Sequence, residues 1–148
     1  MLKLSKKADY ALVALSHLQS HAGSASAKEI ADFYNLSPQM LANVLKRLAA
    51  TGMLLSKRGV AGGYALGRHP QQIFLGEVID VIDGKQALSD CTSFDKDCSA
   101  EPNCPVKSPI SLIHNKIKHY IDSLTLADIA NRDALRSMTI EGPVTTNL

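Results

Sequence analysis

The sequence has no apolar run that could cross a membrane. Its apolar stretches, such as 11–15, are far shorter than the roughly 20 residues of a transmembrane helix. The first residues also lack the basic stretch, apolar core and small-residue cleavage site of a secretory signal peptide. We therefore expect a cytoplasmic protein without membrane contact. Thiols stay reduced in the cytoplasm, so the three cysteines of this 148-residue chain are predicted to be ligands or sensors rather than disulfide partners.

Neither sign of charge dominates the whole chain, whose net charge is +2, but the two halves differ. Residues 1–70 hold nine Lys and Arg against three Asp and Glu, a net of +6. The remaining residues hold seven bases and eleven acids, a net of −4. A basic half joined to an acidic half indicates a polyanion-binding module beside a regulatory or assembly module, although an unevenly charged solvated surface would look the same.

The basic half contains three short helical patterns. Ser5 can cap a first helix that runs to about Gln19, and the capping box at 26–29 begins a second one. Ser37 and Pro38 begin the third helix as its N-cap and first helical residue. Its apolar residues recur at helical spacing on a face that must be buried, namely Leu41, Val44, Leu45 and Leu48.

Amide and cationic side chains share the opposite face of the third helix. They are Gln39, Asn43, Lys46 and Arg47. Amides can read adenine edges, and Lys or Arg can reach guanine or phosphate. Two short helices joined by a tight turn, the second with such a face, are typical of a helix-turn-helix. We therefore predict DNA contacts for this face and for Ser37 and Pro38, although any amphipathic helix has a polar face.

A glycine-rich hairpin is expected directly after the third helix, which Gly52 ends. Strand patterns over 53–57 and 64–66 flank a tip at 58–63, and a hairpin in this position is a wing. Glycines let the tip backbone approach phosphates, and an arginine can enter the minor groove. The predicted DNA-contacting residues of the tip are Arg58, Gly59, Gly62 and Gly63. A nucleotide phosphate loop is excluded, because neither a Walker pattern nor a strand–loop–helix context is present.

The acidic half begins with a short helix over 75–82 that stops at Gly84, and continues with a segment of no discernible period. Loops that long are usually functional or disordered. Ser108 and Pro109 open a last long helix, whose apolar residues follow steps of three and four: Ile110, Ile113, Ile117, Tyr120 and Leu124. This seam favours pairing with a second copy over packing within its own domain. The expected divisions are a winged helix-turn-helix over 1–84, a cysteine loop over 85–107, a dimerisation helix region over 108–130 and a tail over 131–148.

Cys91, Cys98 and Cys104 are spaced Cys-x6-Cys-x5-Cys within this loop. Zinc sites usually use a tight knuckle of two to four intervening residues, which the loop lacks. Three more widely spread thiolates can wrap an iron–sulfur cluster. One coordination position would then be left for Asp9, His114, a water or a small molecule. A zinc site and three unliganded thiols remain alternatives.

Several segments together resemble the IscR/NsrR/CymR family of bacterial winged-helix transcription regulators, in its iron–sulfur-binding branch. They are LSKKADYAL at 4–12, LSP at 36–38, LKRL at 45–48, RGVAGGYAL at 58–66, LGEVI at 75–79 before the cysteine loop, and LTLA at 124–127. The resemblance covers about residues 1–130. It implies a homodimer whose long C-terminal helices cross, with each cluster beside the first helix of the other subunit.

Members of this family differ in the fourth cluster ligand. In the iron–sulfur-assembly type a histidine lies three residues after the last cysteine, where this chain has Lys107. In the nitric-oxide-sensing type an aspartate on the first helix of the opposite subunit completes a four-iron cluster, and Asp9 matches its position. The resemblance therefore implies Asp9 as fourth ligand and favours a 4Fe–4S over a 2Fe–2S cluster. The other interpretation of Asp9 is an exposed acid that the helix dipole favours.

The sequence thus predicts a mainly α fold with a small β-hairpin wing and a long C-terminal dimerisation helix. We expect a non-enzymatic, iron–sulfur-dependent repressor that binds a double-stranded DNA operator as a homodimer and senses iron–sulfur status, redox state or nitric oxide. The cluster is expected to set the separation of the two recognition helices, about 34–36 Å for half-sites one turn apart. Alternatives are a cluster-free or zinc-bound regulator controlled by a protein partner, and an electron carrier, which would not explain the wing.

Overall fold

The computed structural model describes residues 3–21, 23–59, 62–89, 92 and 103–137. Over these residues the chain forms helices with a single two-stranded hairpin, so the predicted mainly α fold with a small wing is confirmed. In chain order the elements are α1 (Lys6–Ser20), α2 (Ala27–Tyr34), α3 (Pro38–Ala50), β1 (Leu54–Lys57), β2 (Gly63–Leu66), the 3-10 turn η1 (Pro70–Gln72), α4 (Leu75–Asp83), α5 (Lys107–Ser123), α6 (Leu126–Ala130) and α7 (Arg132–Ser137).

The first three helices begin where their capping residues predict. Ser5 Oγ accepts a hydrogen bond from the Ala8 amide at 3.1 Å. At the start of α2, Ser26 and Glu29 form a complete capping box. Ser37 caps α3 with Pro38 in its first turn. Each helix start is thus determined locally, by a side chain that satisfies a backbone amide which the helix leaves unpaired.

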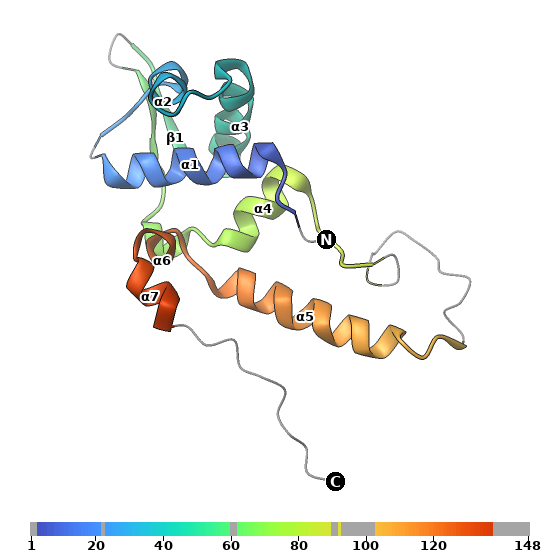
Figure 1. The fold of residues 1–148 in the computed structure, drawn as a ribbon. Helices are drawn as coiled ribbons and strands as arrows, with labels where there is room; N and C mark the ends of the chain where they lie inside the picture. The colour runs from blue at the N-terminus through green and yellow to red at the C-terminus, as the bar shows by residue number, and fades with distance from the viewer. Residues whose placement is uncertain (1–2, 22, 60–61, 90–91, 93–102, 138–148) are drawn as a thin grey trace.

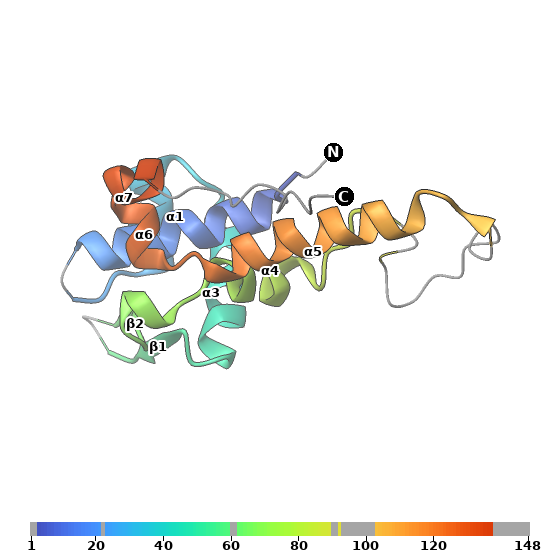
Figure 2. The ribbon, with the colours of Figure 1, turned by 90° about the horizontal axis from the view of Figure 1, so that it is seen from below.

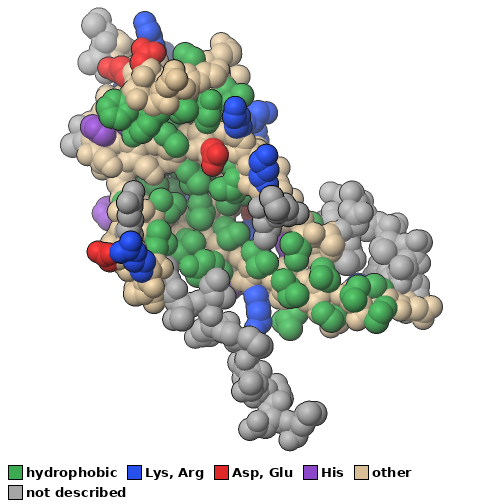
Figure 3. Space-filling model, in the orientation of Figure 1, with side chains coloured by type: hydrophobic (Ala, Val, Ile, Leu, Met, Phe, Trp, Pro, Cys, Tyr) green, Lys and Arg blue, Asp and Glu red, His purple; other side chains and the backbone are tan. Residues whose placement is uncertain are grey.

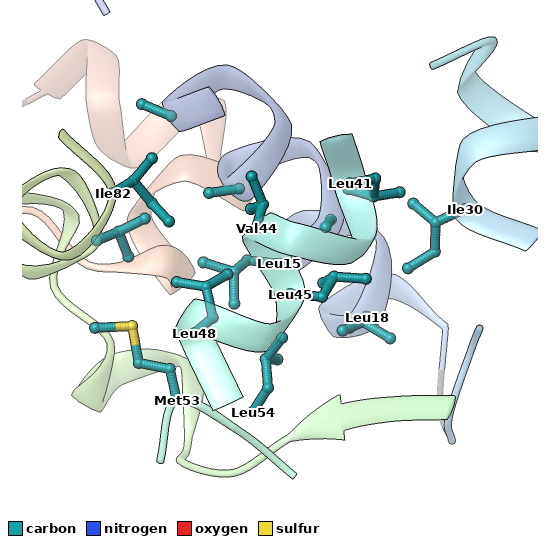
Figure 4. Close-up of a cluster of buried hydrophobic side chains, with 14 of the residues drawn as sticks. Leu15, Leu18, Ile30, Leu41, Val44, Leu45, Leu48, Met53, Leu54 and Ile82 are labelled. Atoms are coloured by element: carbon teal, nitrogen blue, oxygen red, sulfur yellow. The ribbon is translucent and has the colours of Figure 1, made fainter. Parts of the chain in front are cut away.

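The core lies between α1, α3 and the base of the hairpin (Figure 4). The four apolar residues predicted for the inner face of α3 are all buried. They pack with Leu15 from α1, Ile30 from α2 and Leu54 from β1. We call α1–α3 with the hairpin the head. Its packing leaves the opposite face of α3 toward solvent.

The hairpin is antiparallel, with a register that runs from the Leu54–Leu66 pair to the Lys57–Gly63 pair. Its returning strand is also joined to the segment before α2. The Ala25 amide donates to the Tyr64 carbonyl at 3.0 Å, and the Tyr64 amide donates to the Ala25 carbonyl at 2.8 Å. The wing is therefore fixed to the start of the helix-turn-helix as well as to the end of α3.

Helix α4 lies between the head and α5, and contacts α1 and α3 on one side and α5 on the other (Figure 1). Helix α5 runs along α4 and continues beyond the head (Figure 2). Lys118 on α5 donates to Asp80 on α4 at 3.2 Å and to Asp122 on its own helix at 2.5 Å. Burial alone would lower the pKa of Lys118, but the hydrogen bonds to Asp122 and Asp80, together with the negative charges of these carboxylates, outweigh it and raise the pKa.

After α5 the chain returns to the head, which the sequence did not predict. The Leu75 amide donates to the Leu124 carbonyl at 2.8 Å, and the Leu126 amide donates to the Ile73 carbonyl at 2.9 Å. Leu124 and Leu126 are buried, and Leu126 belongs to the core of the head. Leu124, expected in a seam for a second copy, is therefore buried within its own chain. The reason is a capping box of Thr125 with Asp128, which ends the line of α5 and begins α6.

Two smaller differences concern the ends of the predicted segments. Helix α5 begins at Lys107, one residue before the predicted start. Helix α7 occupies the beginning of the region expected to be a polar tail. Within the described part of the chain, no helix combines the length and the apolar character that a membrane span requires.

Candidate nucleic-acid interface and cysteine site

The solvent-facing side of α3 carries the residues predicted to read DNA. Gln39, Asn43 and Lys46 are exposed, as are Ser37 and Pro38 at the start of the helix. The first turn of α3 contains no acidic residue. The partial positive charge of the helix N-terminus is therefore not neutralised there, which suits a phosphate or an electron-rich base edge.

Arg47 has a different environment from the rest of this face, although it lies on the last turn of α3. Its Nη1 donates to the Ile82 carbonyl at 2.9 Å and its Nη2 to the Val81 carbonyl at 2.5 Å. These carbonyls belong to the last turn of α4, where a helix leaves its acceptors unpaired. The guanidinium thus binds α4, and its contact with DNA stays a prediction.

At the wing, Arg58 and Gly59 are exposed, and Gly59 has a φ of +112°, which favours glycine. The other two predicted glycines have internal reasons to lack a side chain. A Cβ on Gly62 would lie 2.6 Å from the Lys57 carbonyl oxygen, and one on Gly63 would lie 2.6 Å from the Ala25 carbonyl. Close packing within the wing for Gly62, and against the segment before α2 for Gly63, explains both glycines without DNA.

Arg68, for which the sequence shows no functional motif, joins the hairpin to two helices. Its Nη1 lies 3.0 Å from both carboxylate oxygens of Glu77 on α4, and its Nη2 donates to the Thr51 carbonyl at the end of α3 at 2.7 Å. In the sequence, only the separation along the chain between the glycine-rich hairpin and the next helix indicates such a contact. The sequence does not identify the partners of Arg68, because they are brought together by the fold.

A histidine–aromatic cluster lies where α1 ends against α2. The rings of His17 and His21 are stacked with centroids 4.1 Å apart, and Phe33 and Tyr34 pack around them. His17 is buried, and its Nδ1 lies 3.4 Å from the Tyr34 hydroxyl. Burial, reinforced by the neighbouring His21, lowers the pKa of His17, while Glu29 acts in the opposite direction.

Of the predicted cluster ligands, the structure describes Asp9 and Cys104. Asp9 is exposed on the first turn of α1, and within the described residues its carboxylate has no hydrogen-bond or ion-pair partner. Cys104 is a free, half-buried thiol three residues before the start of α5. Cys91 and Cys98 lie outside the described residues. Among the residues that are described, no three His, Cys, Asp or Glu side chains come together as a metal site.

The segment that carries the cysteines leaves α4 next to the start of α1. Ser5, the N-cap of α1, donates from its hydroxyl to Asp83 Oδ1 at 2.5 Å, and its amide donates to Asp83 Oδ2 at 3.3 Å. Asp83 is the last residue of α4. The same corner of the molecule therefore holds the end of α4, the beginning of α1 and the beginning of the cysteine segment.

The profile of the Rrf2 family, described as an iron-dependent transcriptional regulator, matches residues 4–132. The chain belongs to the Rrf2 family. This match covers all the elements of the head together with α4, α5 and α6. The expected resemblance to the IscR, NsrR and CymR regulators is confirmed.

Individual relatives extend over nearly the whole chain. The regulator NsrR of Bacillus licheniformis is 31% identical over 141 residues, which are 93% of this chain and 99% of that protein. The regulator CymR of Bacillus subtilis is 32% identical over 133 residues, 88% of this chain and 91% of that protein. Both are named as transcriptional regulators, which agrees with the expectation that this Rrf2 protein is not an enzyme.

Solved structures show the same fold. The structure of B. subtilis CymR, described as the global cysteine regulator of that organism, has a TM-score of 0.70 and 32% identity, covering 88% of this chain and 97% of CymR. The IscR structure from T. potens has a TM-score of 0.67 and 32% identity, covering 95% of this chain and 94% of that IscR chain. The predicted winged helix-turn-helix is therefore confirmed, and the chain is similar both to IscR and NsrR regulators and to CymR.

Proposed function

We propose that this Rrf2 protein is a homodimeric repressor whose affinity for a double-stranded DNA operator is set by an iron–sulfur cluster, favoured as 4Fe–4S. The position of the cysteine segment carries the proposal. The segment leaves α4 beside the Ser5–Asp83 contact, and its last cysteine, Cys104, lies just before α5. A group held there would contact both the head and the helix expected to pair with a second copy. The family description as iron-dependent supports this assignment.

The donor set fits an iron–sulfur cluster by its chemistry. Cys91, Cys98 and Cys104 would supply three thiolates, the ligands that such clusters prefer. Asp9 of the partner subunit would supply the fourth ligand, and its exposed carboxylate within one chain leaves it available for this role. Once bound, the group supplies a link between subunits that loss of iron, oxidation or nitric oxide can break.

The chain's own residues then determine how DNA is held. Gln39, Asn43 and Lys46 would face the major groove from α3, with the start of that helix against a phosphate. Arg58 at the wing would enter the adjacent minor groove. The free energy of operator binding then depends on whether the two α3 helices of the dimer are spaced by one helical turn of DNA.

The exposed side of α5 supports the dimer. No residue of α5 is fully buried within the chain, and Figure 3 shows hydrophobic side chains along its length. Leu112 is 58% exposed and Ile113 is 46% exposed, and Val106, just before the helix, is 55% exposed. Apolar side chains exposed together on one element mark an interaction surface. A second copy of α5 is the occupant that the heptad-like spacing favours.

The experiment that tests the cluster is anaerobic purification of the full-length protein with iron, sulfide and native-mass analysis. We expect a brown protein with cluster mass on the dimer. Asp9→Ala should load a cluster that is lost faster under air or chelator, whereas Asp32→Ala, which removes an exposed acid from α2, should behave as wild type. Identical cluster stability in Asp9→Ala and wild type would remove Asp9 from the ligand set.

A regulator without a cluster is the second candidate, and the similarity to CymR favours it. In that case the protein would be colourless, contain no sulfide and bind its operator with the same affinity in every metal state. A zinc-bound protein would also be colourless but would contain zinc. Salt-dependent operator binding in either case would separate a regulator from an electron carrier.

The dimer is tested independently of the cluster. Ile113→Glu places a charge on the exposed apolar side of α5. We therefore expect a monomer in sedimentation experiments on protein from which a chelator has removed all metal, here called the stripped protein. Asn115→Glu, an exposed position two residues further on, should remain a dimer and serves as the matched control. A dimeric Ile113→Glu variant would place the subunit interface elsewhere.

A further inference from the structure

Helix α4 is tied to the recognition helix at two separate points. At the start of α4, Arg68 joins Glu77 to the carbonyl of Thr51 at the end of α3. At the end of α4, Arg47 of α3 binds the carbonyls of Val81 and Ile82. Helix α4 and helix α3 are thereby connected at both ends of α4, and only the second connection adjoins the cysteine segment.

The Arg47 contact is favoured by the chemistry of both of its partners. The last carbonyls of a helix have no partner inside the helix and carry its partial negative charge, so a nearby cation is favourable. A guanidinium offers two parallel donors in a rigid fork, and here they meet two consecutive carbonyls, at 2.5 Å and 2.9 Å. This geometry constrains the direction of α3 relative to the end of α4 as well as its distance.

A change in the cysteine segment would first displace the end of α4, because the two are adjacent in the chain. Gly84 ends the helix, its amide donating to the Asp80 carbonyl at 3.0 Å, and the segment follows directly. Asp83 beside it holds the start of α1 through Ser5. A displacement of this last turn would therefore reach α3 directly, because the Arg47 side chain joins the two helices there.

We propose that Arg47 is a positioning residue that couples the state of the cysteine segment to the orientation of the recognition helix, rather than a DNA-contacting residue. This inference rests on the proposed function, because it needs a segment whose state changes. Arg47 and the preceding Lys46 are both exposed, but only the Arg47 guanidinium is hydrogen-bonded to α4. Arg47 thus couples α4 to α3, and Lys46 binds DNA.

The test compares Arg47→Gln with Lys46→Gln in the full-length protein. The probe is a DNA duplex selected by the wild-type protein from a random pool, and Kd is measured by fluorescence anisotropy with loaded and with chelator-stripped protein. Allosteric ratios of Kd between two states are typically about 5- to 150-fold, and we expect Arg47→Gln to bring the ratio within about twofold of one. Its salt dependence should stay that of wild type.

Lys46→Gln should weaken both states alike, keep their ratio and reduce the salt slope by about one, as loss of a phosphate contact does. A second readout needs no loaded protein. In the stripped state, amide hydrogen exchange at Gly84 should be faster in Arg47→Gln than in wild type and unchanged in Lys46→Gln. Arg47→Lys, which keeps the charge and can reach one carbonyl, should give an intermediate ratio and covers the case in which Arg47→Gln does not fold.

The outcomes separate the two proposals. A wild-type ratio that persists in Arg47→Gln and Arg47→Lys would overturn the coupling role and leave the proposed function standing. A reduced salt slope in Arg47→Gln with the ratio retained would show that Arg47 contacts phosphate, and would also overturn the coupling role. A wild-type ratio of one would overturn the proposed function, and the coupling role with it.

Discussion

The hydroxyl of Ser5 joins α1 to Asp83 at the end of α4, 78 residues further along the chain: it accepts from the Ala8 amide and donates to Asp83. One side chain thus caps α1 and holds the end of α4. Ser5→Ala should remove both bonds, and loss of a cap alone costs about 1 kcal/mol of the free energy of unfolding. We expect a loss of about 1–2 kcal/mol, because the Asp83 bond is lost as well. Urea unfolding of the stripped protein measures it.

Ser16→Ala is the control for that change. It also removes a serine side chain from α1, but from a position with no capping role, so its effect should stay within a few tenths of a kcal/mol. Asp83→Ala should have about half the effect of Ser5→Ala, since it removes the acceptor on α4 and leaves the cap intact. If Ser5→Ala were as stable as Ser16→Ala, neither the cap nor the bond from the Ser5 hydroxyl to Asp83 would contribute measurably to stability.

The wing should not tolerate a side chain at Gly63. A Cβ there would lie 2.6 Å from the carbonyl carbon and oxygen of Ala25, which are backbone atoms and cannot rotate away. Gly63→Ala should therefore cost about 1–3 kcal/mol, the usual range for overpacking, and weaken operator binding in all metal states. Ser56→Ala, exposed on the other strand, is the control. Normal stability and affinity of Gly63→Ala would show that the wing does not need its contact with Ala25.

Much of the head could be predicted from the sequence because its signals are local. Ser26 with Glu29, and Ser37 with Pro38, mark helix starts through hydrogen bonds to amides within three residues. The apolar spacing on α3 likewise identifies its buried face without reference to any partner. Such patterns depend only on the geometry of one element, and the structure confirms them.

The partners of polar side chains could not be predicted in the same way. The face of α3 contains Lys46 and Arg47 at adjacent positions, and the sequence does not distinguish the one that binds α4, because its acceptors are backbone carbonyls 34 and 35 residues away. The return of α6 was missed because a helix of five residues is too short to show a period. For the cysteines the sequence names candidate ligands, but their arrangement depends on the second subunit.

Stability should fall in mildly acidic solution because of His17. Its pKa in the folded protein lies below the ordinary value of 6.5, chiefly because burial disfavours the charged ring. The unfolded chain therefore binds a proton at a pH where the folded protein does not. The contribution of neutral His17 is fully present above a pH of about 6.5 and is lost as the pH falls through that value toward the lower folded pKa.

His17→Gln tests this difference. Urea midpoints measured at pH values from about 7.5 to about 5.5 should decline less steeply in the variant than in wild type. His119→Gln, which replaces an exposed histidine on α5, is the matched control for the loss of one histidine. Equal slopes in all three proteins would mean that His17 is protonated in the fold without cost.

Leu126 follows α5 in the chain but packs in the core of the head. It lies 60 residues after Leu66, the last paired residue of the wing. Its side chain is 2% exposed in the core, and its amide is held by the Ile73 carbonyl. Leu126→Ala should cost about 2–5 kcal/mol, the range for buried leucines, in urea unfolding of the stripped protein. Leu55→Ala, at a leucine 54% exposed on β1, should cost far less. If both variants were equally stable, α6 would not be packed in solution, and a protein cut after α5 should then unfold at the same urea concentration as the full chain.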